Sequence, residues 1–246
     1  MDLKELESGV DPKVHWYYQS KKVPLFRYFK KVAAATDRPL NVIDFGSGSG
    51  FFAYELYEAF PDQIAQVLLI DIGYTEEELA LTAGQKVQKL RYIPEGIENS
   101  IVIMMDVLEH IEDDYGILAE IVSKLGPRAY FFITVPAFQS VWSSHDVYLG
   151  HYRRYTLPMV EKLLGSVQAV TRNQYYIYAA IFPAVWLLRR FKRTEENMEN
   201  PESSDMSPLP GPLNFLLRAY HNFEMNFRKG NKVFGLTCVA EGVLKN

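Results

Sequence analysis

The sequence is poor in cysteine, in basic charge and in secretion signals. A single cysteine, Cys238, among 246 residues excludes an internal disulfide and a metal site built from several thiolates. The chain has 26 lysines and arginines against 30 aspartates and glutamates, so it lacks the basic excess that general nucleic-acid binding needs. The first residues, MDLKELESGVDPK, are acidic and lack the basic and apolar regions of a signal peptide. We therefore expect a cytoplasmic protein that binds no nucleic acid, with Cys238 as a small core residue.

What the chain does contain is an alternation of strand-like and helix-like segments, clearest between about residues 40 and 135. Because the strand-like runs are continuously apolar, they suit parallel strands that are covered on both faces. The expected strands are 40–45, 66–71, a faint one near 90–93, 101–106, 129–135, 167–179 and 233–244. The expected helices include 51–60, a start near 75–80, 112–126 and 157–165, the last with Thr156 as N-cap.

The first expected strand stops at a glycine loop, GSGSG (46–50), and a helix-compatible segment follows. Glycines at such a position let the backbone approach a ligand, and the start of the next helix offers free N–H groups. Asp71 ends the next strand, 25 positions after Gly46, where a carboxylate is well placed to bind the two hydroxyls of a ribose. This context favours a nucleotide-like cofactor over glycines that only form a tight turn.

The spacing of the glycine loop separates the classes of cofactor. No Gly-Lys-Ser/Thr follows the loop, so the phosphate loop of nucleotide hydrolases is excluded. A dinucleotide-binding loop has a third glycine where this chain has Phe51. Asp44, two residues before the first glycine, would repel a pyrophosphate but can receive a cationic amino group. A nucleoside that carries an amino acid fits this pattern best.

Three features resemble the successive motifs of class I S-adenosylmethionine-dependent methyltransferases: NVIDFGSGSG, the strand-terminal Asp71 and IVIMMDVLEHIEDD. HWYYQSKK, VPAFQSVWSSHDVYLGHYRRYT and FGLTCVAEG resemble a narrower bacterial group of small-molecule methyltransferases associated with glycan and lipid biosynthesis. The resemblance implies an α/β, Rossmann-like fold: a mostly parallel seven-stranded sheet with helices on both faces and an insertion before the last strand. It also implies S-adenosylmethionine as cofactor and a small-molecule acceptor. Nothing in the sequence calls for a metal.

The resemblance also implies cofactor contacts position by position. Asp44 should engage the amino group of the cofactor, and Asp71 should bind the ribose hydroxyls with Ile72 beside the adenine. The residues just past the strand at 101–106 should line the methionine arm, whereas 90–99 is too irregular for an adenine contact to be assigned. The expected cofactor residues are Asp44, Phe45, Gly46, Ser47, Gly48, Gly50, Asp71, Ile72, Met105, Asp106 and Val107.

The stretch SHDVYLGHYRRYT (144–156) gathers polar and aromatic side chains after the strand end at Val135 and Pro136. We expect it to be a loop at the carboxyl edge of the sheet, where open α/β sheets bind ligands. A hydroxyl acceptor needs a base, and the pKa of histidine suits that role. The candidate catalytic residues are His145, the first choice, His151 and His110. The candidate substrate-binding residues are Asp146, Tyr152, Arg153, Arg154 and Tyr155.

These residues have two interpretations that the sequence leaves open. In the first, Asp146 orients a histidine, the two arginines clamp a carboxylate or phosphate of the acceptor, and the tyrosines wall it. In the second, the same groups form a buried network that ties a long segment together. For His110, a place at the mouth of the cofactor pocket and a purely structural role are equally open.

A segment between the last two expected strands, 181–232, has its own character. Residues 174–188 carry no charge, are fewer than the roughly 20 needed to span a bilayer, and precede a basic cluster. Aromatic residues beside basic ones are typical of an interfacial helix, so 175–193 is a candidate for peripheral contact with the inner membrane face. The alternative is a helix pair that packs on the sheet or forms a dimer interface. The polar, proline-rich stretch 194–212 is expected to be a flexible loop.

We therefore predict a single methyltransferase domain. Its parts are N-terminal lid helices (1–38), a cofactor-binding core (39–180), a helical insertion that covers the acceptor (181–232) and a final strand (233–246). The predicted acceptor is an oxygen nucleophile on a saccharide, a lipid-linked molecule or a carboxylate-bearing metabolite. One alternative is an NAD(P)-dependent oxidoreductase or sugar-nucleotide enzyme, which the loop spacing disfavours. The other is a non-catalytic scaffold of the same fold, which the intact glycine loop and Asp71 disfavour.

Overall fold

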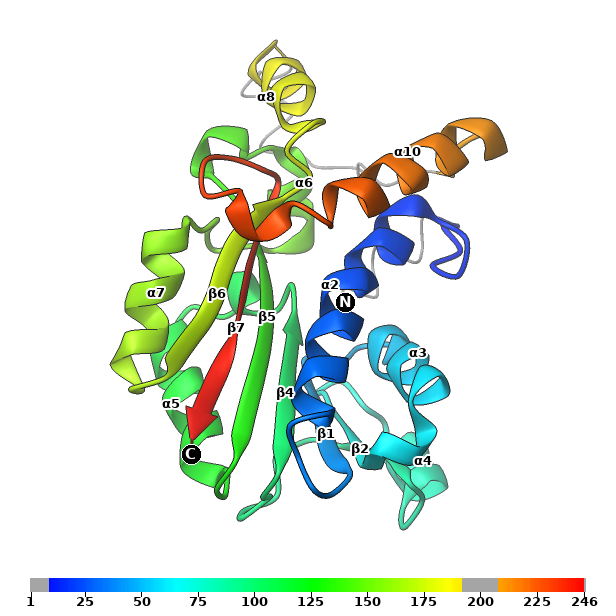
Figure 1. Ribbon diagram of the computed structural model, residues 1–246, viewed down its shortest axis with the longest axis vertical. Helices are drawn as coiled ribbons and strands as arrows, with labels where there is room; N and C mark the ends of the chain where they lie inside the picture. The colour runs from blue at the N-terminus through cyan, green and yellow to red at the C-terminus, as the bar shows by residue number, and fades with distance from the viewer. Residues whose placement is uncertain (1–8, 192–207, 246) are drawn as a thin grey trace.

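The computed structural model describes residues 9–191 and 208–245, and a seven-stranded sheet runs through its centre (Figure 1). The strand order is β3-β2-β1-β4-β5-β7-β6. The strands are β1 (Leu40–Phe45), β2 (Ile64–Ile70), β3 (Val87–Leu90), β4 (Ser100–Met105), β5 (Ala129–Pro136), β6 (Val170–Ile177) and β7 (Thr237–Lys245).

The sheet is mostly parallel, as the sequence predicts. All pairs from β3 to β5 are parallel, and only β7 runs antiparallel to its two neighbours, β5 and β6. The strand expected near 90–93 lies three residues earlier, at Val87–Leu90. Its four residues are all half-buried because β3 is an edge strand, and an edge strand does not need the continuous apolar run that marks the central strands.

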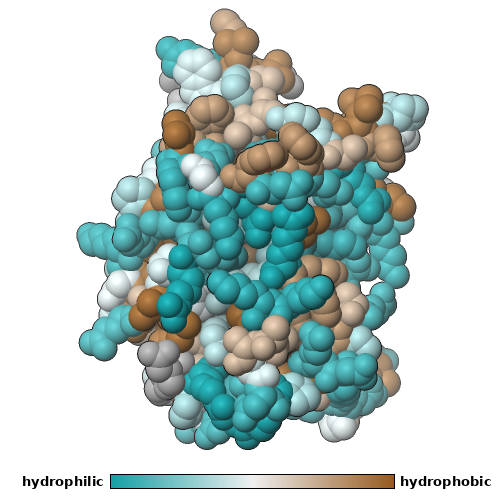
Figure 2. Space-filling view, viewed as in Figure 1, coloured by the Kyte–Doolittle hydropathy of each residue, from teal (hydrophilic) through white to brown (hydrophobic). Residues whose placement is uncertain are grey.

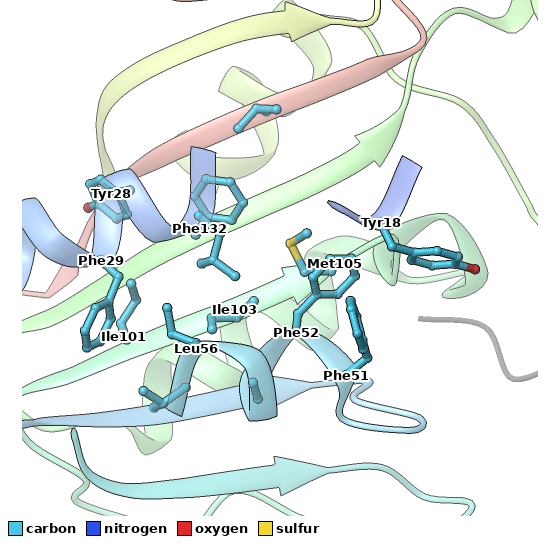
Figure 3. Packing of buried hydrophobic residues seen from close by; sticks show 14 of the residues in the cluster. Tyr18, Tyr28, Phe29, Phe51, Phe52, Leu56, Ile101, Ile103, Met105 and Phe132 are labelled. Carbon is cyan, nitrogen blue, oxygen red and sulfur yellow. The ribbon is translucent and has the colours of Figure 1, made fainter. Parts of the chain in front are cut away.

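Helices cover both faces of the sheet (Figure 1). On one face, α2 (Trp16–Ala33) and α3 (Phe51–Ala59) pack in one core with residues of β1, β2 and β4, and α4 (Glu76–Thr82) lies at its margin. Figure 3 shows Phe29 of α2, Leu56 of α3 and Ile103 of β4 in this core. On the other face, α5 (Asp114–Lys124) and α7 (Leu157–Ser166) build a second core with the alternate strand residues, Met104 among them. The sheet is thus buried between two layers of helices.

Side chains near the N-terminal ends of two helices, α4 and α5, cap them by hydrogen bonds to the backbone. Thr75 and Glu78 form a capping box at α4, which satisfies two backbone N–H groups that would otherwise lack partners. Asp113 caps α5 by accepting a hydrogen bond from the N–H of Gly116 at 2.9 Å. Thr156 does occupy the N-cap position of α7, but its side chain makes no capping hydrogen bond.

The 144–156 segment is not simply a loop. It begins with a short helix, α6 (Ser144–Leu149), which ends at Gly150. Gly150 has φ 78°, a left-handed conformation that stops a helix and that glycine adopts without strain. The sequence prediction missed this helix because six residues are too few to show a helical period.

The insertion contributes α8 (Phe182–Phe191) and α10 (Gly211–Glu224). Residues 174–177 of the uncharged run belong to β6, so the apolar helix is shorter than that run. The predicted flexible loop 194–212 lies mostly outside the described residues. No helix within 9–191 and 208–245 is both long and apolar enough to cross a membrane.

α10 lies against the beginning of α2, as Figure 1 shows. The side chain of Asn214 accepts a hydrogen bond from the N–H of Trp16 and donates one to the carbonyl of Val14, both at 2.8 Å. The ring of His221 stacks on Trp16 with centroids 4.9 Å apart. α2 itself is anchored in the core by Leu25 and Phe29, which are fully buried. Its first turns reach the functional edge of the sheet.

Candidate functional site

The glycine loop (46–50) turns sharply between β1 and α3. Gly46 donates its N–H to the carbonyl of Ile70 at 2.8 Å and has φ 67°, where L side chains are strained. A Cβ at Gly46 would lie 2.6 Å from a methyl carbon of Val107, closer than atoms can approach. Gly50 caps α3 with φ 74°. The loop therefore needs glycine at both ends, which keeps its backbone bare toward the pocket.

Asp71 ties the loop to the end of β2. One carboxylate oxygen accepts the N–H of Gly48 at 2.8 Å, and the other accepts the N–H of Gly73 at 2.9 Å. Tyr74 supports the loop from below, since its hydroxyl lies 2.7 Å from Ser47 Oγ and 2.9 Å from the carbonyl oxygen of Gly48. The sequence analysis missed Tyr74, whose isolated position in a turn carries no recognisable spacing.

Asp44 is a buried carboxyl group at the end of β1. Burial, and then the negative charge of Asp71, raise the pKa of Asp44 to about 7. A cation placed beside Asp44 would offset both effects, because it favours the ionised carboxylate. This is the electrostatic behaviour that an amino-group contact at Asp44 requires.

A pocket of about 610 Å³ opens at this edge of the sheet. The expected cofactor residues that line it are Phe45, Gly46, Gly48, Asp71, Ile72, Asp106 and Val107. The others do not line it: Asp44, Ser47 and Met105 are buried, and Gly50 begins α3. Arg91, Tyr92 and Ile93 form a further wall after β3, in the region where the sequence left the adenine contact unassigned.

The end of β4 places a second polar group in the pocket. Asp106 has φ 56°, an uncommon conformation for a residue with a side chain, and its carboxylate is an ion-pair partner of Lys21 from α2. Thr134 Oγ1 donates to the same carboxylate at 3.0 Å, and the Tyr17 hydroxyl lies 3.3 Å from it. Lys21 is almost fully buried. The sequence analysis missed it because 85 residues separate Lys21 from its partner.

The 144–156 segment turns its main charges inward. Asp146 is fully buried and accepts bonds from Arg154 Nε at 2.7 Å and Arg154 Nη2 at 3.0 Å, and its Oδ1 lies 2.9 Å from His151 Nδ1. Burial alone would raise the pKa of Asp146, but the bond to His151 and the Arg154 guanidinium hold it well below its usual range. This arrangement is the buried network of the second interpretation.

Arg153 and Tyr155 also bind within the protein. Arg153 pairs with Asp114 at 3.0 Å and donates to the carbonyl of Ile111 at 2.9 Å. The Tyr155 hydroxyl donates to Asp114 at 2.7 Å, and burial followed by this bond raises the pKa of Tyr155 above its ordinary value. Acceptor contacts by Arg153, Arg154 or Tyr155 stay predictions, and they would require these internal bonds to be exchanged.

The remaining candidates of this segment differ in exposure. Tyr152 is 53% exposed, so an acceptor can reach its ring. His145 is buried in α6 and does not line the 610 Å³ pocket. The orienting contact of Asp146 is made with His151, not with the first-choice base His145. His151 does not line the pocket either, but its ring packs against His110, which does. A base at either position stays a prediction.

Glu109, His110 and His151 come together beside the pocket, and we refer to them as the histidine–glutamate cluster. One ligand-type atom of each lies within 4.8 Å of the other two, and the two rings meet edge to face with centroids 4.6 Å apart. Glu109 has no exposed surface, and neither carboxylate oxygen has a hydrogen-bond partner. Burial raises the pKa of Glu109 to about 8. His110 lines the pocket, which is the first of the two placements that the sequence leaves open.

Comparison with known families identifies this architecture. Residues 16–171, which include the glycine loop, Asp71 and the histidine–glutamate cluster, match the methyltransferase domain family. The chain belongs to this methyltransferase family. It is accordingly an S-adenosylmethionine-dependent methyltransferase, and S-adenosylmethionine is its cofactor. No curated protein matches the chain in sequence.

Solved structures share the fold at low sequence identity. An S-adenosylmethionine-dependent methyltransferase from Archaeoglobus fulgidus gives a TM-score of 0.53 at 15% identity, with 96% of this chain and 97% of that chain covered. A chain from the complex that contains the Haloferax volcanii Trm112 methyltransferase activator gives 0.51 at 16% identity, with 94% and 95% covered. The cyclase SpnF gives 0.50 at 14% identity, with 89% and 80% covered. At these identities the likeness shows a common fold alone.

The pocket fits the cofactor of this family. The space beside Gly46 is too small for a Cβ, so the backbone there is left without a side chain. The buried Asp44 offers a carboxyl group whose ionised form the positively charged cofactor would favour. Asp71 offers carboxylate oxygens at the pocket wall. The family assignment and the loop spacing together favour methyl transfer over the nicotinamide alternative.

Proposed function

We propose that this enzyme methylates an oxygen nucleophile on a small acceptor, of the saccharide, lipid-linked or carboxylate-bearing kind. The observation that carries the proposal is the polar end of the pocket. Asp106 and His110 line it, and Lys21 and the rest of the histidine–glutamate cluster lie directly behind them. A hydroxyl that enters beside these groups meets hydrogen-bond partners and a means of losing its proton.

In this proposal the pocket residues divide between the parts of the cofactor. Asp44 receives the amino group, Asp71 binds the ribose hydroxyls, and Ile72, Arg91 and Tyr92 line the part of the pocket that takes the adenine. The methionine arm runs past Val107 toward Asp106. Most of the rate enhancement comes from holding the acceptor oxygen in line with the sulfonium methyl group. The cofactor supplies the methyl group and its positive charge.

The histidine–glutamate cluster, not His145, activates the acceptor hydroxyl in our proposal. Asp146 holds His151 in one orientation through Nδ1, which is the arrangement that fixes a functional imidazole. His110 extends the cluster into the pocket. Neither His145, on α6, nor His151 lines that pocket, and His151 is connected to it through its ring contact with His110.

Methyl transfer from labelled cofactor tests this proposal. Saccharides, lipid-linked sugars and small hydroxy acids are offered in turn, and the methylated atom is located by mass spectrometry. We expect an O-methyl product, a fall in kcat of about 100-fold or more for His151→Gln, and a much smaller effect for the control His145→Gln. Methylation at nitrogen, or equal losses in the two variants, would contradict the assignment.

A specific surface feature favours a lipid-linked acceptor. The apolar side chains of α8 and α10 are exposed, and Figure 2 shows brown surface over both helices at the top of the view. The exposed side chains are Trp186, Leu187, Leu188 and Phe191 on α8, and Leu213, Phe215, Leu216, Tyr220 and Phe223 on α10. Arg190 lies over the ring of Trp186 at 5.6 Å, so a cation accompanies the apolar face. We propose that an anionic membrane surface covers these helices.

Co-sedimentation with liposomes tests the membrane proposal separately. Vesicles with anionic headgroups should retain the protein, and the double variant Leu188→Glu, Phe191→Glu should release it. Leu81→Glu is the matched control, because Leu81 is 66% exposed on α4 away from this surface. Equal retention of both variants, or retention of neither the variants nor the native protein, would rule out this docking surface.

A further inference from the structure

The histidine–glutamate cluster has the donor set of a metal site. Among the described residues, Glu109, His110 and His151 are the group of three whose ligand-type atoms all lie within 4.8 Å of one another. Two imidazoles and one carboxylate suit Zn²⁺, Fe²⁺ and related transition-metal ions better than Mg²⁺ or Ca²⁺, which prefer all-oxygen sites.

Glu109 is the observation that points to a ligand. Its carboxyl group is fully buried, and both oxygens lack a hydrogen-bond partner. Buried polar groups in folded proteins are almost always satisfied, and a carboxylate left without a partner is among the most unfavourable groups to bury. A cation held between Glu109 and the two rings would satisfy it.

Asp146 prepares His151 for such a role. The Asp146 carboxylate, which also pairs with Arg154, can only accept hydrogen bonds. His151 Nδ1 therefore carries the proton that points to Asp146. That tautomer leaves the lone pair on Nε2 free for a metal. A carboxylate behind a ligating histidine is the usual support of metal-binding imidazoles.

We propose that Glu109, His110 and His151 bind one divalent transition-metal ion, with Asp146 as the positioning residue behind His151. Three protein ligands leave at least one coordination position open. Because His110 lines the cofactor pocket, that position faces the acceptor side of the pocket. The geometry of the three ligands supports metal binding by itself, whereas a role of the metal in activating the acceptor rests on the proposed methyl transfer.

The metal would bind the acceptor oxygen and lower the pKa of its hydroxyl group. The hydroxyl proton leaves to solvent, and a lone pair of the oxygen attacks the sulfonium methyl carbon. The carbon–sulfur bond breaks with its electron pair remaining on sulfur. The products are the methylated acceptor and S-adenosylhomocysteine, and the metal is neither oxidised nor reduced.

Titration of the metal-free protein with Co²⁺ tests the site without reference to activity. Co²⁺ reports a site with nitrogen and oxygen ligands through its visible absorption, and Zn²⁺ should displace it. We expect one ion per chain and a loss of affinity of about 100-fold or more in Glu109→Gln and in His110→Ala, with a loss of about 10–100-fold in Asp146→Asn. His145→Gln, the matched control in the same 144–156 segment, should bind Co²⁺ like the native protein.

A second measurement separates this proposal from the proposed function and from misfolding. Glu109→Gln should bind S-adenosylhomocysteine as the native protein does, which also shows that it is folded, while Asp71→Ala should lose the nucleoside and keep Co²⁺. Absence of a Co²⁺ spectrum in the native protein, or an unchanged spectrum in Glu109→Gln, would overturn the metal site. In that case Glu109 is a protonated carboxyl group and the cluster an ordinary base. Failure of the native protein to bind S-adenosylhomocysteine would instead overturn the proposed function.

Discussion

The glycine loop (46–50) and the 144–156 segment both follow strands of the same sheet, yet they use polar groups in opposite ways. The glycine loop keeps bare backbone and two carboxyl groups, Asp44 and Asp71, at or just behind the wall of a 610 Å³ pocket. The 144–156 segment pairs its own charges, with Asp146 enclosed by Arg154 and His151. The glycine loop therefore presents its polar groups to a pocket, whereas most charged groups of the 144–156 segment bind one another.

The difference teaches that a dense run of charged and aromatic residues does not by itself mark a binding site. What distinguishes the two regions is whether the buried groups already have partners. The Arg154 guanidinium makes its hydrogen bonds inside the protein, whereas the two carboxyl oxygens of Glu109 have no partner. His151 belongs to both environments, because it contacts Asp146 and lies in the histidine–glutamate cluster.

The largest effect is expected at Asp146. Asp146→Ala removes the partner of a buried guanidinium, and breaking a buried ion pair in this way costs about 3–5 kcal/mol of unfolding free energy. Urea unfolding measures the loss. The control Asp37→Ala breaks the pair with Arg128, whose side chains are 75% and 42% exposed, and should cost less than about 1 kcal/mol. Equal losses would mean that the Asp146 network does not hold the segment together.

The next largest loss of unfolding free energy is expected for Gly46→Ala, in the glycine loop. The left-handed conformation costs about 1–2 kcal/mol for a residue with a Cβ, and the clash with Val107 adds about 1–3 kcal/mol. Gly84→Ala is the control, since Gly84 has φ 72° with nothing within 4 Å of the added Cβ. Unfolding and cofactor titration of both variants separate backbone strain from the clash. A Gly46→Ala protein that binds the cofactor normally would contradict the close approach.

Asp44 should make cofactor binding depend on pH. Asp44 holds its proton up to a pKa of about 7 in the free protein, and the cationic amino group favours the ionised form, so binding releases that proton. Affinity should therefore rise by about tenfold from pH 6 to pH 7.5. Asp71 acts electrostatically on Asp44 in the free protein, and burial, together with the charges of Asp44 and Asp71, raises the pKa of Tyr74 so that it stays neutral.

Calorimetry of S-adenosylhomocysteine in buffers of different ionisation enthalpy detects the released proton directly. Asp44→Asn carries no titrating group at this position and should bind with little change across the same pH range. Equal pH dependence in the native protein and in Asp44→Asn would show that another group releases the proton.

Tyr74→Phe should give the smallest effect. It removes the hydroxyl that lies against Ser47 and the carbonyl of Gly48, and a hydrogen bond of this kind contributes about 1 kcal/mol. Cofactor affinity should fall by roughly fivefold. Tyr54→Phe, on the half-exposed face of α3, should leave affinity unchanged. A larger loss in Tyr54→Phe than in Tyr74→Phe would contradict the supporting role of Tyr74.

The cofactor half of the molecule could be predicted from the sequence because its signals are local. β1 begins and ends where the apolar run does, at Leu40 and Phe45, and the glycine loop and Asp71 stand at fixed positions after their strands. Cys238 is buried, as expected. The predicted position of edge strand β3 was three residues too late, because its half-buried residues do not form a continuous apolar run.

The contacts around Lys21 and the 144–156 segment could not be predicted, because they join residues far apart in the chain. Lys21 meets Asp106, Arg153 meets Asp114, and Glu109 meets His151. No spacing in the sequence reveals such pairs. The sequence likewise could not show which histidine Asp146 contacts, and the structure shows that it is His151.

The most direct test of the account is a calorimetric titration of the native protein with S-adenosylhomocysteine and, separately, with NAD. The glycine loop, the buried Asp44 and Asp71 predict saturable binding of one S-adenosylhomocysteine per chain and no binding of NAD. Binding of NAD without binding of S-adenosylhomocysteine would contradict the assignment of the pocket and, with it, the reaction that we propose.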